Sequence, residues 1–193
     1  KDADIDAAAQ FCAAGKFRNA GQVCISPTRF FVEESVHDAF LAAFKKHIEA
    51  VNVGNGLNDG VTMGPLVAER RIDIMDGFVS DAVSKGAELL VGGSRIQSPG
   101  SFYQPTLLGN VPETARIMVE EPFGPVAPTT SFASLDEVIV RANSLPFGLA
   151  AYAFTSNPAT ARTLKSEIET GMLAVNSLHI HSVETPFGGL KFS

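Results

Sequence analysis

A cysteine that follows a short polar stretch near the start of the chain is the first candidate for chemistry. Cys24 ends the segment Phe17-Arg18-Asn19-Ala20-Gly21-Gln22-Val23-Cys24, whose polar side chains and glycine favour a turn. A thiol on a turn can be exposed and oriented, and as a thiolate it attacks carbonyl carbon. Attack on an aldehyde gives a thiohemiacetal, which releases a hydride only to an acceptor cofactor. The other cysteine, Cys12, lies among alanines, and we interpret it as part of the core.

Other side chains could bind a ligand or a metal, but each also has an ordinary structural explanation. Glu120 and Glu121, taken alone, are typical of a solvated acidic pair. The Arg18 guanidinium could bind a carboxylate, although many arginines simply face water. His179 and His181 lack a third ligand, so we expect them to line a loop or pocket and predict no metal site.

The composition argues against several functional classes. The 193 residues are 45% hydrophobic and carry a formal net charge of -6, which fits one α/β-sized domain. The charges are scattered and form no basic stripe, which argues against nucleic acid as a partner. No apolar run is long enough for a membrane span. Two cysteines without a Cys-x-x-Cys pair argue against a disulfide scaffold and a thioredoxin-like protein, and favour a reducing, cytoplasmic location.

Helical and strand-like segments alternate along the chain. This alternation predicts an α/β fold in which a mostly parallel sheet lies between two layers of helices. Ligands of such folds bind at the carboxyl ends of the strands. We expect Gly15 to end the first helix. The expected helices are Ile5–Ala14, Ser35–Ile48, Glu69–Lys85, Leu135–Asn143 and Pro158–Glu169, and the expected strands are Thr28–Val32, Glu88–Val91, Tyr103–Leu108, Val126–Phe132, Leu149–Thr155 and Met172–Asn176.

The segment that ends at Cys24 resembles the active-site segment of the aldehyde dehydrogenase superfamily, whose pattern is Asn-x-Gly-Gln-x-Cys. Seven further motifs occur in the order found in that family and cover essentially the whole chain. They are Met63-Gly64-Pro65-Leu66, Gly86-Ala87 with Gly92-Gly93, Tyr103-Gln104-Pro105-Thr106-Leu107, Glu120-Glu121-Pro122-Phe123-Gly124-Pro125-Val126, Asn143 with Pro146-Phe147-Gly148-Leu149, Gly171-Met172 with Val175-Asn176, and Pro186-Phe187-Gly188-Gly189.

The resemblance implies roles for individual residues. Cys24 would be the catalytic nucleophile, and its backbone amide would help to hold the oxyanion. Asn19, within the catalytic segment, and Gln22 would shape the turn that carries the cysteine. Glu121 would hydrogen-bond the nicotinamide ribose of NAD or NADP, and Phe123 would position the nicotinamide ring.

The resemblance also implies that residues 1–193 form the catalytic domain of a longer enzyme. Members of the family carry a domain that binds NAD(P), a glutamate base and an oxyanion asparagine before the segment matched here. They carry a strand that pairs between subunits after it. We therefore expect a fragment that begins at Lys1 and is inactive alone, and a complete enzyme that is a homodimer or homotetramer.

Within the superfamily, the chain most resembles succinate-semialdehyde dehydrogenases. The similarity is carried by Lys16-Phe17-Arg18-Asn19 and by the late loop Ile180–Gly189. In that subfamily the residues that match Arg18 and Ser182 hold the distal carboxylate of the substrate. A guanidinium with a neighbouring hydroxyl suits that task.

Three hypotheses remain open from the sequence. The first is an NAD(P)-dependent dehydrogenase that oxidises a semialdehyde to the acid through a thioester on Cys24. The second is a CoA-acylating aldehyde dehydrogenase, which would yield an acyl-CoA instead of the acid. The third is a domain retained only for binding or assembly, for which a thiol-reactive aldehyde analogue would label Cys24 no faster than Cys12.

Overall fold

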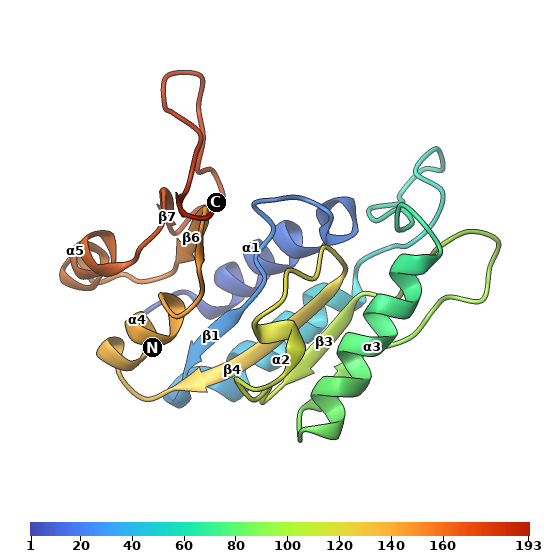
Figure 1. Ribbon diagram of the computed structural model, residues 1–193, viewed down its shortest axis with the longest axis horizontal. Coiled ribbons are helices and arrows are strands. Elements are labelled where there is room, and N and C mark those ends of the chain that lie inside the picture. Colours follow the sequence, from blue (N-terminus) through green and yellow to red (C-terminus); the bar gives the residue numbers. More distant parts are fainter.

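A four-stranded sheet forms the larger part of the computed structural model, which describes residues 1–193 (Figure 1). Its strand order is β1-β4-β3-β2; β1, β4 and β3 run parallel, and β2 is antiparallel to β3. The observed bounds of β2 and β4 are those predicted from the sequence. The strands are β1 (Phe30–Glu33), β2 (Glu88–Val91), β3 (Thr106–Gly109) and β4 (Val126–Phe132).

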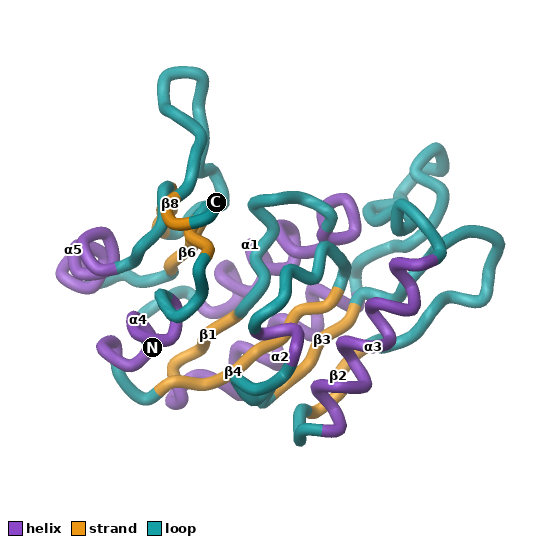
Figure 2. Tube along the Cα trace, viewed as in Figure 1, coloured by secondary structure: helices purple, strands orange, loops and turns teal.

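A second, smaller group of strands lies beside the first sheet and does not pair with it. The parallel pair is β6 (Ala150–Ala153) and β7 (Met172–Val175). A short antiparallel pair, β5 (Phe147–Gly148) and β8 (Leu190–Lys191), brings the last residues back against this group (Figure 2).

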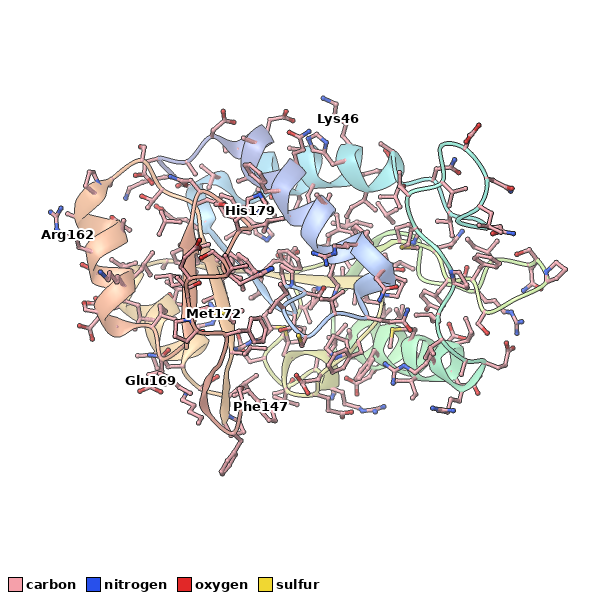
Figure 3. All side chains as sticks on the ribbon, turned by 90° about the horizontal axis from the view of Figure 1, so that it is seen from above. Lys46, Phe147, Arg162, Glu169, Met172 and His179 are labelled. Carbon is pink, nitrogen blue, oxygen red and sulfur yellow. The ribbon has the colours of Figure 1, made fainter.

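Helices cover both faces of the four-stranded sheet, as the alternation of elements predicted. Figures 1 and 3 show α3 on one side of the sheet and α1 with α2 on the other. None of the helices is both long and apolar enough to cross a membrane. The α-helices are α1 (Ile5–Phe17), α2 (His37–Glu49), α3 (Arg70–Ser84), α4 (Leu135–Ala142) and α5 (Pro158–Glu167), and the short 3-10 turns are η1 (Arg18–Gly21), η2 (Glu34–Val36) and η3 (Arg116–Met118).

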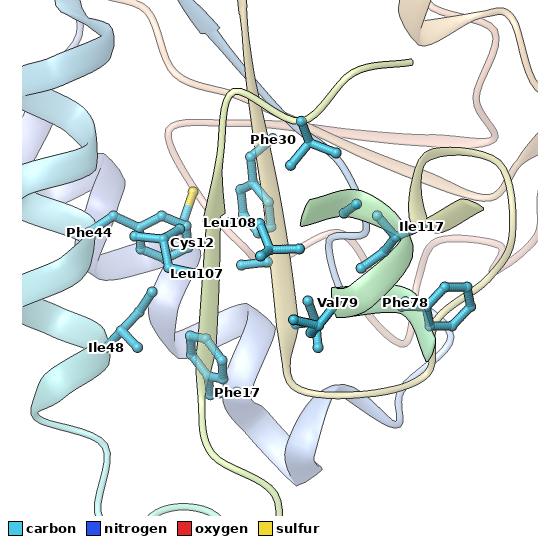
Figure 4. Close-up of a cluster of buried hydrophobic side chains, with 14 of the residues drawn as sticks. Cys12, Phe17, Phe30, Phe44, Ile48, Phe78, Val79, Leu107, Leu108 and Ile117 are labelled. Carbon is cyan, nitrogen blue, oxygen red and sulfur yellow. The ribbon is translucent and has the colours of Figure 1, made fainter. Parts of the chain in front are cut away.

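The core lies between the four-stranded sheet and its helices. All four residues of β3 are buried, because this strand is central and is covered on both faces. Cys12 lies in the same cluster, near Phe44 and Leu107 (Figure 4). Burial raises the pKa of the Cys12 thiol to about 12. Cys12 is therefore a core residue, as its alanine-rich surroundings predicted.

The end of the first helix differs from the prediction. Gly15 does not end α1, which continues to Phe17. A Cβ atom at Gly15 would lie 3.0 Å from Leu178 Cδ1, so the glycine allows close packing of a later segment against the helix. The helix ends instead at Arg18, where the backbone becomes extended, and the cysteine turn follows at once.

Candidate active site

The turn before Cys24 is built from three consecutive residues with left-handed backbone. Asn19, Ala20 and Gly21 have φ angles of 51°, 53° and 70°. This conformation costs about 1–2 kcal/mol for each residue that carries a Cβ atom, and it persists only where the surroundings enforce it. The tight reversal after α1 places Cys24 at the surface, and Cys24 is exposed while Cys12 is buried.

The side chains of Asn19 and Gln22 lock this turn. Asn19 Nδ2 donates to the Gln22 carbonyl at 3.0 Å, and Gln22 Nε2 donates to the Asn19 carbonyl at 3.1 Å. Gln22 also ties the turn to a distant loop, because its Oε1 accepts from the Val67 amide at 2.9 Å. The Asn-x-Gly-Gln pattern is thus explained by the shape of the turn, and Asn19 acts through the backbone that it positions.

Gly21 brings the cysteine turn into contact with the loop that carries Glu121 and Phe123. A Cβ atom at Gly21 would lie 2.2 Å from the Gly124 carbonyl oxygen, so no other residue fits at this contact. The structure therefore places two motifs side by side that are about 100 residues apart in the sequence. This contact sets the position of the candidate cofactor-binding residues relative to the nucleophile.

The two neighbouring carboxylates of this loop have different partners. Glu120 accepts two hydrogen bonds from Arg116, at 2.8 and 3.1 Å, and the hydrogen bonds from Arg116 lower the pKa of Glu120. Glu121 is exposed and forms neither a hydrogen bond nor an ion pair within the chain. The Phe123 ring is 38% exposed, while its carbonyl accepts from Arg71 at 3.2 Å. The free carboxylate can accept hydrogen bonds from hydroxyl groups of a ligand, and the exposed ring can contact a flat ring.

A cavity of about 770 Å³ lies between the two groups of strands. Its wall includes every residue of β1 and of β6, Tyr152 among them, together with Cys24 and Glu121. The structure therefore brings the predicted nucleophile and one of the two predicted cofactor-binding residues to one cavity. Arg18, Phe123 and Ser182 do not line it.

The predicted substrate-binding pair is not joined by any contact. Arg18 is exposed on η1 and forms neither a hydrogen bond nor an ion pair. Ser182 lies in the exposed loop before β8, where its hydroxyl is 3.3 Å from Thr185 Oγ1 and accepts from the Glu184 amide at 3.3 Å. Arg18 is free to meet a ligand, whereas the Ser182 hydroxyl is engaged within its own loop.

Sequence reasoning missed two residues near the cysteine turn. Lys16 is completely buried, and its ammonium group has no hydrogen-bond partner. Tyr152 on β6 donates its hydroxyl to the Ile25 carbonyl at 2.8 Å, one residue after the cysteine. The apolar neighbours of Lys16 on α1 were a weak signal for its burial. Nothing in the sequence indicated the pairing of Tyr152 with a residue 127 positions away.

We expect the two cysteines to differ strongly in reactivity towards iodoacetamide. Cys24 is exposed, whereas Cys12 is buried and its thiol is hard to ionise, so Cys24 should be alkylated at least on the order of 100-fold faster. Trypsin separates the two residues, because Arg18 and Lys16 lie between them, and mass spectrometry of each peptide gives its rate. In urea both cysteines should react at similar rates. Similar rates in the native protein would show that Cys24 is not accessible.

Comparison with known proteins agrees with this geometry. The profile of the aldehyde dehydrogenase family matches residues 1–193. The chain belongs to the aldehyde dehydrogenase family.

Several similar members of the family carry the name of one enzyme. The mitochondrial succinate-semialdehyde dehydrogenase of Rattus norvegicus is 43% identical over 192 residues, which cover 99% of this chain and 37% of that protein. The NADP(+) succinate-semialdehyde dehydrogenase of Escherichia coli is 38% identical and matches over 40% of its length. A solved succinate-semialdehyde dehydrogenase from Burkholderia pseudomallei superposes with a TM-score of 0.97 at 39% identity, over 99% of this chain and 40% of that one. The chain thus spans about two fifths of the length of these relatives.

Proposed function

We propose that the chain is the cysteine-bearing catalytic domain of an enzyme that oxidises a semialdehyde, such as succinate semialdehyde, to the carboxylic acid. The observation that carries the proposal is the exposed thiol of Cys24 on a locked, left-handed turn at the wall of a large cavity. The relatives named succinate-semialdehyde dehydrogenase support the substrate class. In this proposal, residues 1–193 function together with an NAD(P)-binding domain that lies outside them, in a homodimer or homotetramer.

In the first step, the Cys24 thiolate attacks the carbonyl carbon of the aldehyde. A carbon–sulfur bond forms, and the electron pair of the carbonyl double bond moves to oxygen. The Cys24 backbone N–H donates to no acceptor within the chain, so it is available to stabilise that oxyanion. The turn holds the sulfur and this amide in a fixed arrangement before the substrate binds. This reduces the entropy that must be lost to reach the transition state.

The residues of the neighbouring loop suit a nicotinamide cofactor. When bound, NAD or NADP accepts the hydride that leaves the carbon attached to Cys24, which turns the adduct into a thioester. The free Glu121 carboxylate would accept hydrogen bonds from ribose hydroxyls, and the exposed Phe123 ring would contact the nicotinamide. Attack of water on the thioester carbon then breaks the carbon–sulfur bond, and the two protons of the water end on the acid and on the thiol of Cys24.

Arg18 should determine the preference for substrates with a distal carboxylate. In the complete enzyme, Arg18→Ala should raise KM for succinate semialdehyde by about 10- to 100-fold, because a charge-assisted hydrogen-bonded pair is lost. The values for butanal, which has four carbons and no carboxylate, should change less than about twofold. Steady-state kinetics with both aldehydes measure the difference.

Arg162→Ala is the matched control for this experiment. Arg162 is also an exposed arginine without a hydrogen bond or ion pair, but it lies on the outer side of α5 (Figure 3). Equal losses on both aldehydes, or no loss in Arg18→Ala, would remove the semialdehyde assignment and leave the aldehyde dehydrogenase class. An acyl-CoA product formed in the presence of coenzyme A would favour the CoA-acylating class. Absence of turnover with any aldehyde would favour a binding domain.

A further inference from the structure

The peptide group between Ile25 and Ser26, one residue after Cys24, is held at both of its ends. The Ser26 amide donates to the Val23 carbonyl at 2.9 Å, which closes a four-residue turn with Cys24 and Ile25 at its centre. The carbonyl of the same peptide group, that of Ile25, accepts from the Tyr152 hydroxyl at 2.8 Å. One contact comes from within the turn, and the other comes from a different sheet.

The second contact joins the β6–β7 pair to the turn that carries Cys24. β6, which carries Tyr152, pairs with β7 and with no strand of the four-stranded sheet. No other hydrogen bond joins the β6–β7 pair to residues 22–27. The Tyr152 hydroxyl is therefore the polar group of β6 that holds the Ile25 carbonyl.

The hydroxyl of Tyr152 is close enough to the thiol to interact with it electrostatically. Both residues line the same cavity. Burial first, and the negative charge of Cys24 second, raise the pKa of Tyr152 to about 12 against the opposing effect of the Arg18 cation. Cys24 and Arg18 are thus the two titratable groups whose charges act on the pKa of Tyr152. The phenol stays protonated, and so remains a donor, over the range in which a thiol ionises.

We propose that Tyr152 is a positioning residue for Cys24: its hydroxyl fixes the Ile25 peptide and so directs the thiol into the cavity. The proposal rests on the proposed function in one respect, namely that Cys24 is the nucleophile. The donated hydrogen bond also offsets the negative end of the Ile25 carbonyl dipole in the turn that carries Cys24. Without it, that dipole would disfavour the thiolate, and the turn would lose its outer support.

The alkylation of Cys24 by iodoacetamide, followed from pH 6 to pH 10, tests this role on the 193-residue chain. Tyr152→Phe should move the midpoint of the rate profile to higher pH and slow alkylation at pH 7 by about fivefold to tenfold. Tyr103→Phe is the matched control, since Tyr103 is the only other tyrosine and also donates its hydroxyl, to Asp76 at 2.9 Å. That variant should leave the Cys24 profile unchanged.

Two results would overturn the proposal. One is a Tyr152→Phe profile that overlays that of the unsubstituted chain, and the other is an equal shift in both variants, which would indicate general loosening. If Tyr152→Phe does not fold, 3-fluorotyrosine in the Tyr103→Phe chain labels Tyr152 alone and keeps its packing. Its more acidic hydroxyl is a stronger donor, so the midpoint should move to lower pH, and an unmoved midpoint would contradict the proposal. Because alkylation requires neither aldehyde nor cofactor, a negative result would overturn only the role of Tyr152.

Discussion

Cys24→Ala is expected to lower kcat for aldehyde oxidation by more than roughly 10³-fold in the complete enzyme, because no other group can form the carbon–sulfur bond. The side chain is exposed on a turn whose geometry is set by Asn19, Gly21 and Gln22, so its removal leaves these contacts intact. We therefore expect an unchanged melting temperature. Steady-state kinetics and circular dichroism measure the two quantities.

Cys12→Ala is the matched control for Cys24→Ala. Cys12 is 8% exposed within the core, so its replacement should cost about 1 kcal/mol of stability and leave kcat within about twofold of its original value. A large loss of kcat in both variants would mean that the effect of Cys24→Ala is structural. Activity retained in Cys24→Ala would exclude covalent catalysis by this residue.

Lys16→Met is expected to stabilise the protein by roughly 2 to 4 kcal/mol at pH 6. Lys16 is completely buried in the last turn of α1 and its ammonium has no hydrogen-bond partner, so the charged form is strongly disfavoured. Burial lowers the pKa of Lys16 to about 7. Methionine has a similar length and no charge to desolvate. Urea unfolding of both proteins measures the difference in the free energy of unfolding.

The stabilisation by Lys16→Met should depend on pH in a defined direction. Between about pH 7 and the ordinary lysine pKa of 10.5, unfolded Lys16 holds a proton that the folded form has released. The stability of the unsubstituted protein therefore gains up to about 1.4 kcal/mol per pH unit from this residue in that range. The advantage of Lys16→Met should be largest below pH 7 and should shrink as the pH rises.

Lys46→Met is the control for the removal of a lysine. The Lys46 side chain is 75% exposed on α2 and extends into solvent (Figure 3). Its only ion pair, with Asp6 at 4.0 Å, contributes little at the surface. We expect a change below about 0.5 kcal/mol with no dependence on pH. A lower stability of Lys16→Met at pH 6 would show that the buried ammonium is paired after all.

Elements whose own residues determine their structure were predicted well from the sequence. β4 and β2 have the expected bounds because each is a short segment with apolar or β-branched residues that follows a glycine or proline break. The end of α1 was not predicted, because Gly15 serves a contact with Leu178 that lies 163 positions away. The sequence alone does not distinguish a glycine that ends a helix from a glycine that allows another segment to pack closely against the helix.

The part of the candidate site that lies within one short segment could be predicted from the sequence. Asn19, Gln22 and Cys24 lie within six residues, so their pattern was sufficient to identify the turn. The burial of Lys16 and the hydrogen bond from Tyr152 to Ile25 were not predictable, because they depend on the packing of other elements around that turn. Burial and hydrogen bonds that depend on segments far apart in the sequence can be identified only from the three-dimensional structure.

The central claim is that the substrate becomes covalently attached to the sulfur of Cys24, and rapid acid quenching followed by mass spectrometry tests it most directly. The complete enzyme is mixed with succinate semialdehyde and NAD(P)+, quenched during turnover and digested with trypsin. We expect a succinyl group on the peptide Asn19–Arg29, which contains Cys24, and none on the peptide that contains Cys12. Oxidation of the aldehyde with the acyl group on another residue, or with no acyl group at any time point, would contradict it.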